Sequence, residues 1–194
     1  MPGRTLGPAG FSFASTDGKG RIMQFEIAQP SDLDALHALI ERAYRGDSAR
    51  GGWTHEADLL QGQRTDIEAL SDLLASADDT IIVARDGASL AGCIAVTIKP
   101  GGIAYIGMVT VDPSRQANGL GRQLLASAET HAAAAGATVA EMTVIVQRAE
   151  LIAWYERRGY RLTGEWRPFP YGNERFGLPE RDDLEFVVLE KPLT

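Results

Sequence analysis

The sequence predicts an α/β fold built on a mixed, mostly antiparallel twisted sheet of about seven strands, with helices on both faces. Runs rich in β-branched and other apolar residues, typical of strands, are interspersed with segments whose apolar residues recur every three to four positions, typical of helices. Two turn signals, Asp86-Gly87 and Gly101-Gly102, join successive strand-like runs and favour antiparallel hairpins. No internal repeat divides the 194 residues, a length sufficient for one domain with a sizeable core.

The first half of the chain predicts one strand, two helices and then three strands. After a strand at 24–28, Ser31 is placed to cap a helix that Gly46 ends. Thr65 and Glu68 have the spacing of a capping box, which opens a second helix. Strands are then expected at 80–85, 90–99 and 103–111.

The second half alternates helices and strands. A helix is expected from Gly119 to about Ala135, where Gly136 supplies a C-terminal stop. The remaining elements are a strand at 139–147, a short helix at 149–158, strands at 160–163 and 184–189, and a long loop at 166–180.

Residues 1–22 differ in composition from the rest of the chain. They are rich in Gly, Ser and Pro, show no hydrophobic period and have no apolar stretch of signal-peptide length. We expect them to form a flexible N-terminal tail, or an over-extended start, with the folded domain at 23–194.

The stretch 109–122 carries the strongest functional signal. A β-branched strand runs through a Pro-marked turn and a glycine-rich bend directly into an amphipathic helix. Unpaired backbone N–H groups at a helix N-terminus, together with the helix dipole, favour an anion. Gly119 and Gly121 have no Cβ, so a phosphate can approach the main chain closely. The sequence therefore predicts a phosphorylated ligand.

Two common phosphate loops fit this stretch badly. No Lys-Ser or Lys-Thr follows the glycines, as a P-loop requires, and Leu124 stands where a dinucleotide fingerprint has its third glycine. The pattern that fits is [RQ]-x-x-G-x-[GA], as Gln116, Gly119 and Gly121, after a strand that ends in Val-Asp-Pro. Here the chain resembles the GNAT superfamily of N-acetyltransferases, whose signature loop cradles the pyrophosphate of acetyl-CoA. The predicted order of elements is also that of the superfamily.

A second segment, 148–160, resembles the family's N-x-x-A-x-x-x-Y-E-K-x-G-F motif. In that motif the Tyr hydroxyl lies near the cofactor sulfur, so the resemblance implies that Tyr155 protonates the leaving thiolate as general acid. The alternative is that Tyr155 is ordinary half-buried helix packing. Arg148 stands where the family has Asn.

The resemblance also implies which residues bind acetyl-CoA as co-substrate. Backbone groups of Val109 and Val111 would pair with the pantetheine amides, although their side chains fit a core role equally well. Arg115 and Arg122 flank the loop, where they would pair with phosphates or simply face solvent. The expected cofactor-binding set is Val109, Thr110, Val111, Gln116, Ala117, Asn118, Gly119, Leu120, Gly121, Arg122 and Arg148.

The general base is less well defined. His55, the one histidine in a predicted connector, and the adjacent Glu56 are the catalytic candidates besides Tyr155. Asp66, Tyr105 and Glu141 are further alternatives. None of them stands in a diagnostic motif. The segments that normally determine the acceptor in relatives, here 46–64 and 166–180, carry no recognisable signature.

Composition excludes several classes of protein. The net charge of −7 argues against a nucleic-acid partner, and no apolar run approaches the roughly 20 residues that span a bilayer, so we expect no membrane partner. The single cysteine, Cys93, excludes an internal disulfide framework and indicates a reducing compartment, hence the cytoplasm. No H-x-x-x-H, C-x-x-C or clustered carboxylates predict a metal site.

We therefore expect an acyltransferase that moves the acetyl group of acetyl-CoA to a primary amine by direct attack, with a small amine or amino-acid-like molecule as acceptor. The alternatives are a protein or peptide N-terminal acetyltransferase and a non-catalytic acyl-CoA-binding regulatory module. A homodimer is one state that the resemblance allows, since dimers are common among relatives.

Overall fold

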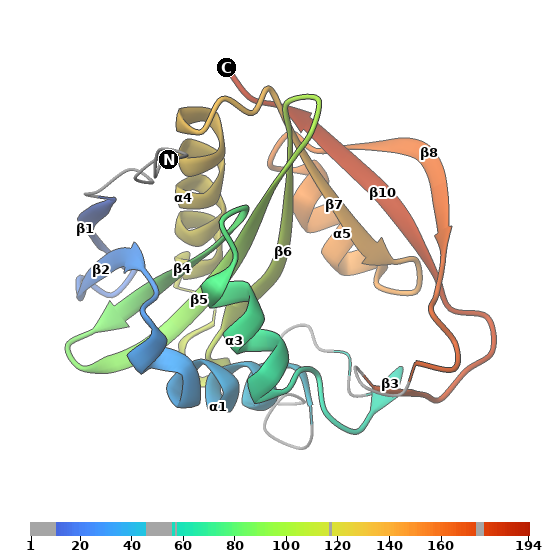
Figure 1. Ribbon diagram of the computed structural model, residues 1–194, viewed down its shortest axis with the longest axis horizontal. Coiled ribbons are helices and arrows are strands. Elements are labelled where there is room, and N and C mark those ends of the chain that lie inside the picture. Colours follow the sequence, from blue (N-terminus) through green and yellow to red (C-terminus); the bar gives the residue numbers. More distant parts are fainter. Residues whose placement is uncertain (1–10, 46–55, 57, 117, 174–176) are drawn as a thin grey trace, which may run out of the picture.

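The computed structural model describes residues 11–45, 56, 58–116, 118–173 and 177–194. Within this part of the chain, eight strands form one open, twisted sheet (Figure 1). In sheet order they are β1 (Ser12–Thr16), β2 (Ile22–Ile27), β4 (Asp79–Asp86), β5 (Ser89–Lys99), β6 (Ile103–Val111), β7 (Val139–Ile145), β10 (Glu185–Pro192) and β8 (Arg161–Pro168). Neighbouring strands are antiparallel, except that β6 and β7 are parallel. The predicted α/β fold with a mostly antiparallel sheet is confirmed, with one strand more than expected.

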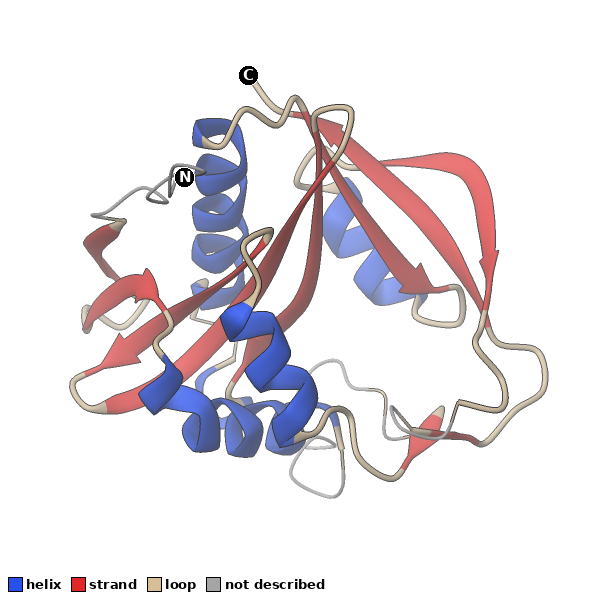
Figure 2. Ribbon diagram, viewed as in Figure 1, coloured by secondary structure: helices blue, strands red, loops and turns tan. Residues whose placement is uncertain are grey.

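Helices cover both faces of the sheet, as predicted (Figure 2). They are α1 (Leu33–Tyr44), α3 (Ile67–Ala75), α4 (Leu120–Ala134) and α5 (Ala149–Glu156), with short 3₁₀ turns η1 (Pro30–Asp32) and η2 (Pro113–Arg115). Strand β4 shows why two layers form. Its Ile82 and Ala84 join the core cluster of α4 and α5, whereas Ile81 and Val83 join that of α1 and α3. Successive side chains of a strand point to opposite faces, so this wholly apolar run needs a helix layer on each side.

The extra strand, β1, corrects the expectation of a flexible tail over the whole of 1–22. It pairs antiparallel with β2, and the ring of Phe13 stacks on that of Phe25 at 4.8 Å between centroids. The turn between the strands is closed by Asp17, whose carboxylate accepts hydrogen bonds from the backbone N–H groups of Lys19 and Arg21 at 2.8 and 3.0 Å. The alternation of aromatic and small residues at 11–15 and the Asp-Gly turn are hairpin signals, which the glycine- and serine-rich composition of 1–22 concealed.

Helix starts differ from the prediction by one residue. The N-cap of α3 is Asp66, whose carboxylate accepts a hydrogen bond from the N–H of Ala69 at 2.7 Å, rather than Thr65. Similarly α1 begins after Asp32 and not after Ser31, because η1 occupies the first turn. None of the described helices has the length and apolar character to cross a bilayer.

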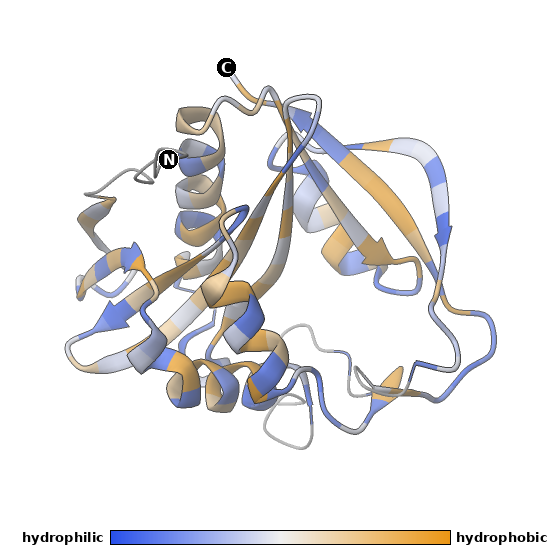
Figure 3. Cartoon of the chain, in the orientation of Figure 1, coloured by the Kyte–Doolittle hydropathy of each residue, from blue (hydrophilic) through white to orange (hydrophobic). Residues whose placement is uncertain are grey.

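The C-terminal side of the sheet ends in β8. Figure 3 shows the hydrophobic middle of β10 beside the largely hydrophilic β8, which is an edge strand. Within the loop predicted at 166–180, β9 (Leu178–Pro179) pairs with β3 (Leu60–Gln61) in a separate two-stranded sheet. This pairing ties the connector after α1 to the loop before β10.

Strands β6 and β7 diverge, and this divergence positions the site. Only Ile103, Ala104 and Tyr105 of β6 are in register with β7, although β6 continues to Val111. Opposite β5, β6 carries a bulge at Met108, the one non-glycine among the described residues with a positive φ, 52°. A bulge bends its strand and strengthens its twist. The second half of β6 therefore has no pairing with β7, and its backbone on that side faces the gap between the two strands.

Candidate active site

The glycine-rich loop connects β6 to α4 as predicted. Asp112 organises its first turn, since its carboxylate accepts a hydrogen bond from the N–H of Ser114 at 3.0 Å and pairs with Arg42 at 3.1 Å. Gly119 is the N-cap of α4 with a φ of 78°, a left-handed conformation that favours glycine. A Cβ on Gly121 would lie 3.6 Å from both Trp154 and Val111, so the start of the helix packs closely against α5 and β6.

A pocket of about 680 Å³ lies in front of this loop. Of the expected cofactor-binding set, it is lined by Val111, Gln116, Asn118, Gly119, Leu120, Gly121 and Arg122. The Leu120 side chain is buried in the core, which leaves its main chain for a ligand. The N-terminal hairpin reaches the same pocket, where the N–H of Gly18 donates to the carbonyl of Asn118 at 2.9 Å. Ala117 lies outside the described residues.

Two arginines that the sequence analysis missed also line this pocket, Arg157 and Arg158 at the end of α5. The guanidinium of Arg158 lies 3.4 Å from the centroid of the Trp154 ring. Partial burial lowers the pKa of Arg158, and the positive charges of Arg157 and Arg122 lower it further. The positive charges of these arginines repel one another, and an anion bound between them would offset that repulsion. Their adjacency in the sequence, just after Trp154, was the available signal.

These residues fit the diphosphate of a nucleotide donor. The pocket combines a helix N-terminus, the N-cap Gly119 with no atom closer than 4.0 Å to its Cβ position, and the three arginines Arg122, Arg157 and Arg158 in its lining. The same residues would stabilise a pyrophosphate through backbone N–H groups and through charge.

A smaller cavity of about 150 Å³ lies where β6 and β7 diverge. It is lined by Tyr155 of α5, by Tyr44 of α1 and by residues of β6 and β7. Tyr155 is 5% exposed, and its ring meets that of Trp154 edge to face at 5.0 Å between centroids. Burial raises the pKa of the Tyr155 phenol, and the neighbouring Tyr44 raises it further. The phenol therefore keeps its proton at neutral pH, as a proton donor must.

Of the three expected β6 residues, Val109 lines the Tyr155 cavity and Val111 lines the donor pocket, whereas Thr110 lines neither. The carbonyl of Val109 accepts a hydrogen bond from the Tyr44 hydroxyl at 2.8 Å, and that of Val111 accepts one from Gln116 at 3.5 Å. The Thr110 hydroxyl is buried and donates to the carbonyl of Met108 at 2.9 Å. A ligand running from the donor pocket into the gap between β6 and β7 would thus meet Val111 and then Val109.

Glu56 lies at the centre of a buried charge cluster. One carboxylate oxygen is 2.9 Å from Arg45 and the other is 3.1 Å from Arg148, while Arg64 lies 3.6 Å away. Burial opposes ionisation of Glu56, but the charges of Arg64, Arg148 and Arg45 outweigh it and lower its pKa. A carboxylate with a lowered pKa is a weak proton acceptor. Arg148 and Tyr155 line the same cavity, so Glu56 orients an arginine beside the expected acid.

The other base candidates that the structure describes, Asp66, Tyr105 and Glu141, have structural contacts. His55 lies outside the described residues. Asp66 caps α3. Tyr105 shares a 2.7 Å hydrogen bond with Thr143. Hydrogen bonds from Arg167 lower the pKa of Glu141 to about 2, with a further contribution from Lys99. Among the described residues no group of three or more His, Cys, Asp or Glu is placed to hold a metal ion.

The fold and these pockets define a class: an α/β acyltransferase with an anion-binding loop beside a split sheet. Residues 33–160 match the acetyltransferase (GNAT) family model. The chain is 32% identical over 172 residues to an IAA acetyltransferase from Azospirillum brasilense, covering 86% of this chain and 97% of that protein. It therefore belongs to the GNAT family and is an acyl-CoA-dependent N-acetyltransferase.

Solved structures share the fold at low sequence identity. The GNAT domain of S. lividans PAT superimposes with a TM-score of 0.70 at 16% identity, over 96% of this chain and 99% of that chain. The structure of yncA, a putative acetyltransferase from Salmonella typhimurium with its cofactor acetyl-CoA, has a TM-score of 0.65 at 17% identity, over 89% and 94% of the two chains.

Proposed function

We propose that this chain transfers the acetyl group of acetyl-CoA to the primary amine of a small, amino-acid-like molecule. One observation carries the proposal: the lining of the Tyr155 cavity connects with that of two larger pockets. In the donor pocket, Trp154 is adjacent in sequence to Tyr155, and Val111 is two residues after Val109; Tyr155 and Val109 line the cavity. The cavity also shares Arg64, Tyr105, Gly107 and Met108 with a third pocket, of about 620 Å³.

In the proposed mechanism the two substrates meet in this cavity without an acyl-enzyme. Acetyl-CoA, when bound, supplies an acetyl group activated as a thioester. The main chain of Val109, Thr110 and Val111 positions the donor arm, and the loop 116–122 with Arg148 completes the donor site. As the C–N bond forms and the C–S bond breaks, the Tyr155 phenol gives its proton to the sulfur. His55 is the proposed proton acceptor for the amine, with Glu56 orienting Arg148.

The experiment that tests this proposal compares Tyr155→Phe with Tyr160→Phe. Tyr160 is also buried and touches Tyr155 edge to face, but it does not line the cavity. We expect acetyl-CoA-dependent thiol release to fall about 10²- to 10⁴-fold in Tyr155→Phe, with acetyl-CoA affinity nearly kept. Tyr160→Phe is expected to retain turnover. Unchanged turnover in Tyr155→Phe would remove the phenol from the mechanism.

The acceptor screen for this assay contains amines, amino acids, polyamines, N-terminal peptides and IAA, which is named in the Azospirillum relative. Preference for a peptide would favour the N-terminal acetyltransferase alternative. We further propose a cytoplasmic location, supported by the lone and fully buried Cys93, and a homodimer, which size-exclusion chromatography tests.

A further inference from the structure

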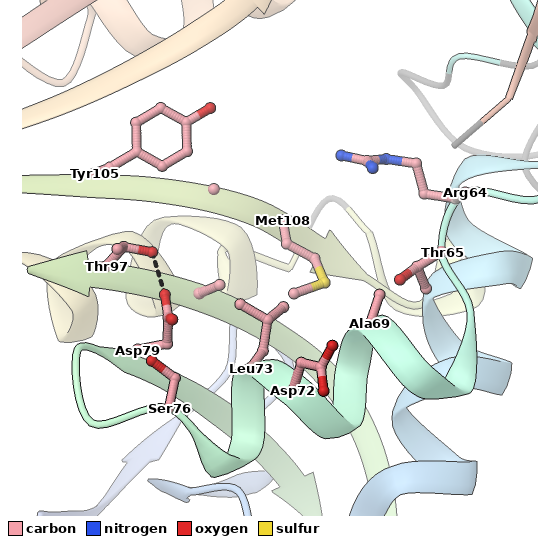
Figure 4. Close-up of a pocket in the computed structure, with 12 residues that line it drawn as sticks. Arg64, Thr65, Ala69, Asp72, Leu73, Ser76, Asp79, Thr97, Tyr105 and Met108 are labelled. Carbon is pink, nitrogen blue, oxygen red and sulfur yellow. Dashed lines mark hydrogen bonds between the residues drawn. The ribbon is translucent and has the colours of Figure 1, made fainter. Parts of the chain in front are cut away.

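The third pocket, on the α1 and α3 side of the sheet, has the features of an acceptor site. Residues of α3, β4, β5 and β6 line it (Figure 4). Since it shares Arg64, Tyr105, Gly107 and Met108 with the Tyr155 cavity, a molecule that fills it has one end at the reaction centre. This reasoning rests on the proposed function, which places acetyl transfer in that cavity.

The end near the reaction centre is cationic. Arg64 lies over the Tyr44 ring, 5.0 Å from its centroid, and its guanidinium extends across the pocket toward Tyr105 in Figure 4. Glu56 only partly neutralises it, because the Glu56 oxygens have closer partners and the separation from Arg64 is 3.6 Å. Among the described residues none accepts a hydrogen bond from the Arg64 side chain. Guanidinium groups bind carboxylates with two parallel hydrogen bonds, so this end suits a carboxylate.

The middle of the pocket is apolar. Ala69 and Leu73 of α3 face Ala95 of β5 and Met108 of β6 across it. Methylene groups of a ligand would contact these side chains and leave water. Met108 is also the residue at the bulge, which directs its side chain into the pocket (Figure 4).

Two carboxylates, those of Asp72 and Asp79, also line the pocket. Asp72 is exposed on α3, and no residue in the described part of the chain pairs with its carboxylate. In Figure 4 this carboxylate rises from α3 with the Met108 side chain between it and Arg64. Asp79 accepts a hydrogen bond from Thr97 beside it. A carboxylate without a partner beside an apolar channel suits a cation.

We propose that the acceptor is an α-amino acid with a cationic side chain. Its carboxylate binds Arg64, its methylenes contact Met108 and Leu73, and its side-chain cation pairs with Asp72. The α-nitrogen is then the group at the reaction centre. It bonds to the acetyl carbon as the C–S bond breaks, giving an Nα-acetyl amino acid and CoA. The sulfur takes its proton from Tyr155, and the amine gives its proton to the acceptor proposed above, His55.

The test uses matched acceptors: lysine, norleucine, which lacks the distal charge, and cadaverine, which lacks the carboxylate. For the wild type we expect lysine to exceed both analogues in kcat/KM by about tenfold or more, with the product acetylated at the α-nitrogen by mass spectrometry. Asp72→Asn is expected to lose the preference for lysine over norleucine through KM, with norleucine turnover kept. Arg64→Gln is expected to lower kcat/KM for lysine about tenfold more than it lowers kcat/KM for cadaverine.

Asp78→Asn is the control, since Asp78 is an exposed carboxylate near the end of α3 that does not line the pocket. Asp72 is itself exposed, so its variant keeps the fold even if Arg64→Gln is destabilised. Equal effects of Asp72→Asn on lysine and norleucine, acetylation at the side-chain nitrogen, or preference for an acceptor without a carboxylate each overturn this inference. Absence of acetyl-CoA binding by calorimetry, or of thiol release with every acceptor in the screen, overturns the proposed function instead.

Discussion

Replacing Glu56 with Gln tests the buried charge cluster most directly. The change keeps the shape of the side chain and removes its charge from a site where 11% of the side chain is exposed. Arg45 and Arg148, themselves 7% and 8% exposed, then lose the carboxylate that lies 2.9 and 3.1 Å from them. Breaking a buried ion pair by removing one partner typically costs about 3–5 kcal/mol.

Urea unfolding monitored by circular dichroism measures this cost. With a slope of about 2 kcal/mol per M, the midpoint is expected to fall by roughly 1.5–2.5 M. The control is Glu165→Gln, which removes a carboxylate that pairs with Arg167 but is 54% exposed, and its midpoint is expected to change little. If Glu56→Gln and Glu165→Gln unfold at the same urea concentration, the cluster does not stabilise the fold and the role inferred for Glu56 is wrong.

Two further changes probe the donor loop and a second charge cluster. Gly119→Val places a side chain in the donor pocket and is expected to weaken acetyl-CoA binding by more than about tenfold in calorimetry, whereas Gly136→Val, with a similar left-handed φ of 88° at the other end of α4, carries the same strain without loss of binding. If both variants lost acetyl-CoA affinity equally, backbone strain in α4 and not a blocked donor pocket would explain the loss. The pKa of Glu141 is lowered from 4.5 to about 2 in the folded protein. The ionised Glu141 carboxylate therefore contributes fully to stability above about pH 4.5, and this contribution is lost as the pH falls toward 2. The difference in unfolding free energy between wild type and Glu141→Gln should shrink over that range, and a constant difference would contradict the assignment.

Local patterns predicted the donor side well. The strand, turn and helix around Gly119 follow from residues adjacent in sequence, and each of these elements formed within a few residues of its expected bounds. For Tyr155 the resemblance, rather than the pattern of residues, implied a place near the cofactor sulfur, and the structure shows it lining the cavity where β6 and β7 diverge. Its catalytic role stays a prediction that the tyrosine variants test.

Contacts between residues far apart in the sequence could not be predicted from local patterns. Glu56 and Arg148 are 92 positions apart, and only the packing of the connector against the start of α5 brings them together. The acceptor-like pocket was likewise not predicted, because its polar groups come from Arg64 before α3 and from Asp72 within it, and the strands that close it come later in the chain. Strand β1 was missed because its composition resembles a linker, although its aromatic residues alternate as in a strand.

The short register between β6 and β7 has a mechanical consequence. Three residue pairs, from Ile103 to Tyr105, join two parts of the sheet: a five-stranded half, β1, β2, β4, β5 and β6, and a three-stranded half, β7, β10 and β8. At the end of this junction, the side chains of Tyr105 and Thr143 share a hydrogen bond across the two halves. A donor bound in the gap would contact both halves and restrict their movement relative to each other. Hydrogen exchange of amides far from the donor, along β10 and β4, would then slow together when the donor binds.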